Sequence, residues 1–120
     1  MAATETLYRI FEPLSEGDYH AQLARTPGCA VVLFSNASCG ACRAWKRLLP
    51  EALATFTTNF YEVDVALATG LARYFGIFHL PTIYLYRDGR FHAELQSEAR
   101  ADAVLMVARA LLAAPAQEEP

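Results

Sequence analysis

The sequence has few of the features that mark exported, membrane-spanning or nucleic-acid-binding chains. Its three cysteines are too few for a structural disulfide framework. No segment approaches about eighteen consecutive apolar residues, so no transmembrane helix is expected. The formal net charge is only −3 and the lysines and arginines form no long run, so neither nucleic acid nor a membrane is an expected partner.

The N-terminal segment also lacks the pattern of a secretory signal. Met1-Ala2-Ala3-Thr4-Glu5 shows no basic region followed by an apolar stretch. This pattern predicts a cytoplasmic location, where thiols are kept reduced. In such a compartment a close pair of cysteines is interpreted as catalytic, redox-sensing or metal-binding.

The length and composition predict one globular domain. The chain has 120 residues, of which 54% are apolar, and this is enough to bury an ordinary core. We see no internal repeat and no linker. The domain is therefore expected to fill residues 1–120, with a core over about 8–113 and a loose tail over 115–120.

The most informative feature is the segment Cys39-Gly40-Ala41-Cys42. It follows the apolar run 30–34 and opens a long helical pattern. Two cysteines at this spacing can bring their sulfurs within bonding reach around one helical turn. A thiol at a helix N-terminus also meets unpaired N–H groups and the positive end of the helix dipole, which favour the thiolate. Because the thiolate attacks disulfides, the segment is interpreted as a redox pair.

Hydrophobic periodicity predicts the order of the other elements. Strands are expected at 8–11, 29–34, 60–65, 82–86 and 91–95, and helices after Ser15, from 39 to 56, from 67 to 75 and after Ser97. Within the last strand, residues 91, 93 and 95 should share one face, with His92 exposed on the other. The order β-α-β-α-β-α-β-β-α predicts an α/β domain in three layers.

This order, together with three motifs, resembles the thioredoxin family. The motifs are Cys39-Gly40-Ala41-Cys42, then the segment 75–82 with sequence FGIFHLPT, then Arg87-Asp88-Gly89-Arg90. The resemblance runs from about Tyr8 to about Ala113. It implies a thioredoxin-like sandwich with a central mixed sheet flanked by helices.

The resemblance also implies how a substrate would be held. Pro81 should follow a cis peptide bond, and Leu80 and Pro81 should lie beside the two sulfurs. Together with Gly40 and Ala41 they would contact an extended substrate segment, in the manner of an added strand.

Four positions depart from the family pattern. Ser38 stands where the family has a tryptophan, and Ala41 stands where a proline is usual. The acidic residue that many thioredoxins bury under the second cysteine falls on Leu33, and its lysine partner falls near Phe60. The proton relay of that pair is therefore expected to be missing, and Asp64 is the nearest carboxylate that could replace it.

The resemblance and the helix position assign roles to the two cysteines. Cys39 is nearer the helix start and should be the exposed nucleophile, whereas Cys42 should be the resolving thiol. Arg43 and His79 could tune the pKa of Cys39. Both side chains can equally be ordinary solvated surface residues.

A metal site is the less favoured alternative for the pair. Structural zinc usually takes four ligands, and only Cys29 and three histidines remain as candidates. Cys29 begins the strand whose far end leads to Cys39, about 17 Å away by strand geometry. It is interpreted as a small buried residue, and no metal or other bound cofactor is expected.

Two functions remain open from the sequence. The leading one is a thiol–disulfide oxidoreductase that acts on protein or peptide disulfides through Cys39 and Cys42. It would need a recycling reductase or a thiol pool. The alternative is a binding or adaptor module of the same fold, with little or no redox turnover.

Overall fold

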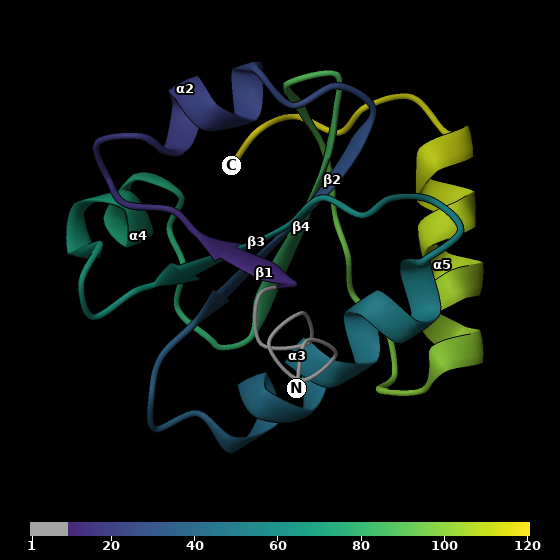
Figure 1. The fold of residues 1–120 in the computed structure, drawn as a ribbon, viewed down its shortest axis with the longest axis horizontal. Coiled ribbons are helices and arrows are strands. Elements are labelled where there is room, and N and C mark those ends of the chain that lie inside the picture. Colours follow the sequence, from purple (N-terminus) through teal and green to yellow (C-terminus); the bar gives the residue numbers. More distant parts are fainter. Residues whose placement is uncertain (1–9) are drawn as a thin grey trace, which may run out of the picture.

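The computed structural model describes residues 10–120 (Figure 1). The order of elements is β-α-β-α-β-α-β-β-α, as the sequence predicts. The strands are β1 (Phe11–Pro13), β2 (Cys29–Ser35), β3 (Phe60–Asp64), β4 (Thr82–Arg87) and β5 (Arg90–Glu94). The helices are α2 (Tyr19–Ala24), α3 (Gly40–Leu53), α4 (Thr69–Tyr74) and α5 (Ala101–Ala113).

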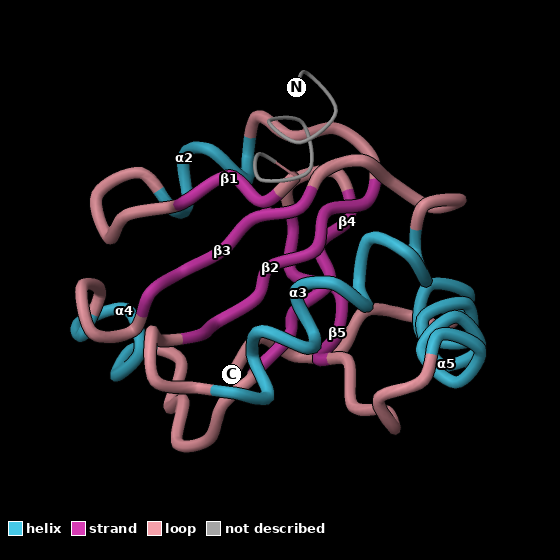
Figure 2. The backbone as a smooth tube through the Cα atoms, turned by 60° about the horizontal axis from the view of Figure 1, so that its bottom comes forward, coloured by secondary structure: helices cyan, strands magenta, loops and turns pink. Residues whose placement is uncertain are grey.

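The strands form one mixed sheet in the order β1-β3-β2-β4-β5. β1, β3 and β2 are parallel, whereas β4 and β5 run antiparallel to their neighbours. The central strand β2 is buried along almost its whole length, which explains its unbroken apolar run (Figure 2). Because β2 and β4 are antiparallel, the end of β2 lies beside the start of β4, where Phe34 pairs with Thr82.

Helices cover both faces of the sheet, which gives the three expected layers. α3 and α5 pack on one face through an aliphatic cluster that includes Leu33, Leu49 and Val104. α2 and α4 pack on the other through a cluster rich in aromatic rings, such as Tyr19 and Tyr84. Figure 1 shows the two helix pairs on opposite sides of the strands. α3 keeps its apolar stripe across Pro50, since Leu49, Ala52 and Leu53 are all buried.

The first and last strands differ from their predicted bounds. β1 begins at Phe11, and the predicted start at Tyr8 lies outside the described residues. In β5, Phe91 pairs with Tyr86 whereas Ala93 pairs with Leu85, so His92 is an extra residue in a bulge.

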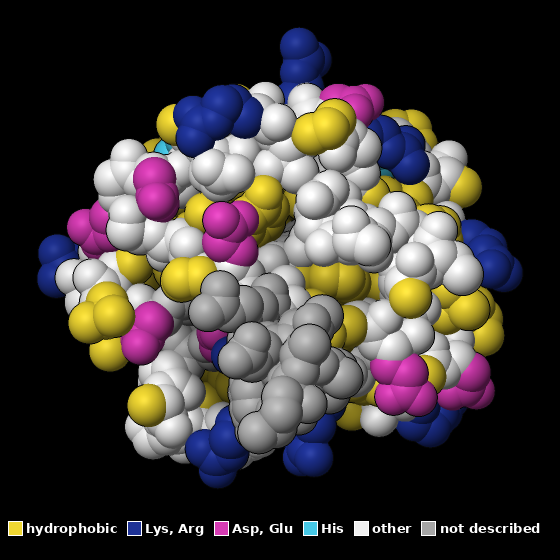
Figure 3. Space-filling model, viewed as in Figure 1, with side chains coloured by type: hydrophobic (Ala, Val, Ile, Leu, Met, Phe, Trp, Pro, Cys, Tyr) yellow, Lys and Arg dark blue, Asp and Glu magenta, His cyan; other side chains and the backbone are white. Residues whose placement is uncertain are grey.

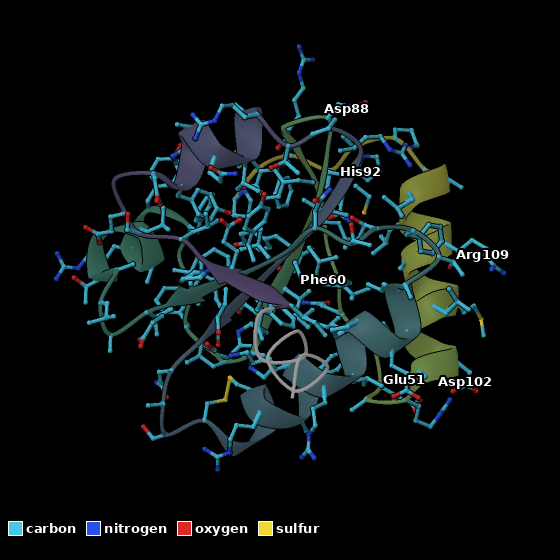
Figure 4. All side chains as sticks on the ribbon, viewed as in Figure 1. Glu51, Phe60, Asp88, His92, Asp102 and Arg109 are labelled. Atoms are coloured by element: carbon cyan, nitrogen blue, oxygen red, sulfur yellow. A yellow bond between two sulfur atoms is a disulfide. The ribbon has the colours of Figure 1, made fainter. Side chains whose placement is uncertain are left out.

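This bulge inverts the alternation of side chains along β5. Phe91 joins the aromatic cluster and Leu95 the aliphatic one, so the prediction that they share a face was wrong. His92 was predicted to be exposed but is buried. Its Nε2 donates to the carbonyl oxygens of Leu111 (2.8 Å) and Ala114 (3.1 Å) at the end of α5 (Figure 4).

The C-terminal part also departs from the sequence-based expectation. α5 begins at Ala101 with Arg100 as its N-cap residue, so Ser97 is not the cap. The tail 115–120 has no helix or strand, but it lies along the edge of β5. There the N–H of Gln117 donates to the His92 carbonyl (2.7 Å), and Gln117 Oε1 accepts from the N–H of Glu94 (3.1 Å).

Candidate redox site

The two cysteines of the predicted pair form a disulfide at the start of α3. The S–S distance is 2.17 Å and the Cα atoms are 5.2 Å apart. Cys39 is the N-cap residue of α3, and its Sγ accepts from the N–H of Cys42 at 3.0 Å. The Cys39 sulfur therefore lies at the free N–H groups and the positive end of the helix dipole, which stabilise a thiolate.

The two sulfurs differ in exposure. Cys39 is half-buried, whereas the residue Cys42 is only 3% exposed. Gly40 and Ala41 between them are exposed on the first turn of the helix. An incoming disulfide can thus reach Cys39 first.

The loop between β2 and α3 is held by its own polar groups. Asn36 Oδ1 accepts from the N–H of Ser38 at 2.9 Å, and the Asn36 carbonyl accepts from the N–H of Cys39 at 3.2 Å. Arg43 Nη1 donates to the Ala37 carbonyl at 3.3 Å. The Arg43 guanidinium therefore lies over the loop that carries Cys39 and places a positive charge on that side of the site.

The segment before β4 reaches the same end of the sheet. The peptide bond between Leu80 and Pro81 is cis, and both residues are half-buried. Thr82 Oγ1 donates to the His79 carbonyl at 2.7 Å, which closes this turn. The pairing of Phe34 with Thr82 brings the turn next to the loop that leads to Cys39. The contact of Leu80 and Pro81 with a substrate remains a prediction.

His79 and the aromatic residues near it face solvent. The side chain of His79 is exposed and lines a shallow hollow with Phe78 and Leu80, which does not include either cysteine. Phe75 is buried, whereas Tyr74 is 60% exposed. Phe78 is 95% exposed and lies one residue before His79. A tuning role for His79 stays a prediction.

A cleft of about 850 Å³ opens beneath Cys42. Lys46, one helical turn after Cys42, forms an ion pair with Glu62 of β3, with 2.7 Å between Nζ and Oε1. Ser35 Oγ donates to the other carboxylate oxygen of Glu62, also at 2.7 Å. Ser35, Cys42, Lys46 and Glu62 all line the cleft, so a carboxylate and an ammonium share it with the buried cysteine.

Glu62 and Lys46 were missed from the sequence, although two signals were present. Glu62 interrupts the buried strand β3, where Phe60, Tyr61 and Val63 are all buried. Lys46 follows Cys42 at the spacing that places both on one helix face. The register shows that Glu62 pairs with Leu33, the position where the family's buried acid was expected.

Asp64 is less suited to the role that the sequence suggested for it. It also lines the cleft, but its Oδ1 accepts from the N–H of Ala66 at 2.9 Å and so closes the turn after β3. Its place as a replacement proton acceptor remains a prediction.

Cys29 lies at the other end of β2 and is not bonded to another cysteine. Burial raises the pKa of its thiol, and the nearby Arg87 lowers it in part. Among residues 10–120, no three His, Cys, Asp or Glu side chains gather closely enough to hold a metal ion. Over the same range, no helix is long and apolar enough to cross a membrane.

Comparisons with known proteins define first the class of fold. The human ERp44 structure in its zinc-bound form superposes with a TM-score of 0.69 at 19% sequence identity. The match covers 83% of this chain and 31% of that one. At this identity the likeness concerns the fold, an α/β thioredoxin-like sandwich with a five-stranded mixed sheet.

The family follows from the sequence comparison. The thioredoxin family model matches residues 11–110, so the chain belongs to the thioredoxin family. The chain is also similar to protein disulfide-isomerase A3 of Gallus gallus, with 30% identity over 97 residues. That match covers 77% of this chain but 19% of the relative, so the chain spans about a fifth of that protein's length.

Proposed function

We propose that the chain is a thiol–disulfide oxidoreductase that acts on protein or peptide disulfides. The observation that carries the proposal is the Cys39–Cys42 disulfide at the N-terminus of α3, in which Cys39 is half-buried and Cys42 is buried. Family membership supports partners that carry protein thiols or disulfides in general.

The reduced pair would act in two exchange steps. The Cys39 thiolate attacks one sulfur of a substrate disulfide, forms a mixed disulfide and releases the other substrate sulfur as a thiolate. Cys42 then loses its proton and attacks Cys39 Sγ, which restores the Cys39–Cys42 disulfide and releases the second substrate thiolate. The substrate gains two electrons and the pair loses two. A recycling reductase or a thiol pool returns the pair to the dithiol.

Gly40, Ala41, Leu80 and Pro81 would hold the substrate during these steps. The first two are exposed beside Cys39, and the last two lie on the turn that leads into β4. The backbone of that turn would pair with an extended segment of the substrate and present its disulfide to Cys39. This reaction needs no bound cofactor. The cytoplasmic location predicted from the sequence remains a prediction.

A binding or adaptor module is the second candidate. Its support is the serine at position 38 and the fully buried Leu33, which replace residues that the family uses for exchange, and the exposed ring of Phe78. Such a module would hold a partner near Pro81 and leave the disulfide unchanged. The two candidate functions differ in whether disulfide exchange with a substrate depends on Cys39.

Single-turnover exchange between the reduced protein and a disulfide peptide separates the two. We expect a rate that is lost in Cys39→Ser and kept in Cys29→Ser, a matched change of the unpaired cysteine. The pair should also equilibrate reversibly with glutathione buffers between roughly −200 and −270 mV. Equal rates with and without Cys39, or a pair that stays reduced throughout, would support the binding module instead.

A further inference from the structure

We propose that Glu62 takes the proton of the Cys42 thiol when Cys42 attacks the mixed disulfide. This inference rests on the proposed exchange function and assigns the proton step of the same site. The residue Cys42 is only 3% exposed, so its thiol meets solvent only through the cleft that it lines. A buried thiol attacks slowly unless a nearby base accepts its proton.

Two elements fix the Glu62 carboxylate in the cleft that Cys42 also lines. Lys46 lies one turn along α3 from Cys42, and its ammonium contacts Glu62 Oε1 at 2.7 Å. Ser35, at the end of β2, donates to Oε2 at 2.7 Å. Lys46 Nζ also lies 5.9 Å from the centre of the Phe11 ring, so its position is fixed from a second side. The carboxylate thus has both oxygens bound and a defined place in the cleft.

The register of the sheet supports the same assignment. Glu62 pairs directly with Leu33, whose side chain is fully buried and cannot accept a proton. In this chain the carboxylate is on β3, next to the β2 position where the family has its acid. The lysine is on α3, whereas the family's lysine is on the sheet. The chain therefore keeps a carboxylate and an ammonium under the second cysteine, supplied by different residues.

The other carboxylates of the cleft are engaged elsewhere. Glu16 Oε1 accepts from the N–H groups of Gly70 and Leu71 at the start of α4. Asp18 Oδ1 accepts from the N–H and hydroxyl of Ser15. Asp64 closes its own turn, as described above. Among residues 10–120, the cleft is lined by one cation besides Lys46, which is Arg43, and its guanidinium donates to the Ala37 carbonyl.

The cleft supplies the path between the two groups. Its volume of about 850 Å³ has room for many water molecules, each of which fills about 30 Å³ of the liquid. During resolution the proton passes from Cys42 Sγ through water to Glu62, as Cys42 bonds to Cys39 Sγ and the substrate thiolate leaves. In the reverse direction Glu62 returns the proton to Cys42. No other oxidant or reductant is required.

Reaction with an aromatic disulfide, dithiobis(nitrobenzoate), resolves this step from the first one. Attack by Cys39 releases one coloured thiolate, and attack by Cys42 releases the second. In a Cys29→Ser background, Glu62→Gln should keep the first rate and slow the second by at least about tenfold at neutral pH. The second rate should then rise with pH and approach the parent rate once hydroxide takes the proton directly.

Three variants control the measurement. Glu62→Asp keeps a carboxylate and should regain most of the second rate. Glu51→Gln makes the same change on the exposed side of α3, far from the disulfide in Figure 4, and should leave both rates unchanged. Asp64→Asn tests the competing carboxylate.

The outcomes separate failure of this step from failure of the proposed function. A second rate in Glu62→Gln that equals the parent rate over the whole pH range overturns the role of Glu62. Slowing in Asp64→Asn alone also overturns it and moves the role to Asp64. Absence of any Cys39-dependent first release overturns the exchange function itself, and this inference with it.

Discussion

Strand β2 has one cysteine at its amino end and the cysteine pair just beyond its carboxyl end. At the amino end, Cys29 is half-buried, and side chains hold the backbone around it. Its carbonyl accepts from Thr57 Oγ1 at 2.5 Å, and the neighbouring Gly28 N–H donates to Asp88 Oδ1 at 2.7 Å. Burial raises the pKa of the Cys29 thiol and keeps it protonated at neutral pH.

The carboxyl end gives its cysteines a different environment. The strand leaves the sheet, a short loop follows, and Cys39 sits where α3 has unpaired N–H groups. Figure 4 shows the disulfide at the end of the molecule opposite Asp88, which marks the hairpin beside Cys29. On the face shown in Figure 3, acidic and basic side chains are interspersed, so the described residues form no large patch of one charge on that face. The two ends of β2 therefore place the same residue type in two environments: a half-buried thiol with a raised pKa at Cys29, and a helix N-terminus at Cys39.

The sharpest test of this contrast is to trap the exchange intermediate. Replacing Cys42 with Ser leaves Cys39 without a resolving thiol, so the mixed disulfide with a substrate peptide should accumulate to nearly one per chain. Intact-protein mass after acid quenching measures the adduct. The Cys39→Ser/Cys42→Ser variant, which retains Cys29, should form almost none. If that variant formed as much adduct per chain, the two ends of β2 would not differ in reactivity.

The two ends should also differ in alkylation rate. In the reduced protein at neutral pH, we expect iodoacetamide to label Cys39 at least about a hundredfold faster than Cys29, because the thiolate is the reactive form. The pKa of the Cys29 thiol is raised, so its labelling should increase as the pH rises and the gap should narrow. Peptide mapping of the labelled protein gives both rates. Similar labelling rates for the two cysteines at neutral pH would contradict the expected difference. In denaturant, where the fold is lost, the two rates should become alike.

Much of this contrast was predictable from the sequence, because it depends on patterns with a short range. The unbroken apolar run of β2, the cysteine spacing and the apolar stripe that continues across Pro50 fixed the order of elements. The separation of Cys29 from the pair followed from strand geometry alone. Fold and redox pair were therefore both predicted before any contact was known.

What the sequence did not show depends on register and tertiary contact. The pairing of Leu33 with Glu62 arises only when β2 and β3 align, and the Lys46–Glu62 ion pair needs α3 to cross that pairing. The bulge at His92 changes which side chains of β5 face each side of the sheet. It buries His92, which a regular alternation of side chains would have exposed. Neither register nor a single inserted residue leaves a periodic signal in the sequence.

A smaller effect is expected when the amino end is loosened. Thr57→Val removes the hydroxyl that donates to the Cys29 carbonyl and should lower the free energy of unfolding by about 1 kcal/mol. Urea unfolding measures this loss. The redox potential of the pair should not change, since the substitution lies at the opposite end of β2. A shifted potential would show that the two ends are coupled.

The smallest effect concerns the charge that lies over the carboxyl end. Arg43→Ala removes the guanidinium beside the loop of Cys39. It should slow alkylation of Cys39 about two- to threefold at mildly acidic pH, where only part of the thiol is ionised. Arg47→Ala, an exposed arginine one turn further along α3, is the matched control and should change the rate less. High salt should abolish the Arg43 effect, because exposed charges are screened. If both variants behave alike, the local helix terminus alone activates Cys39, and the reactivity of this end of β2 owes nothing to neighbouring cations.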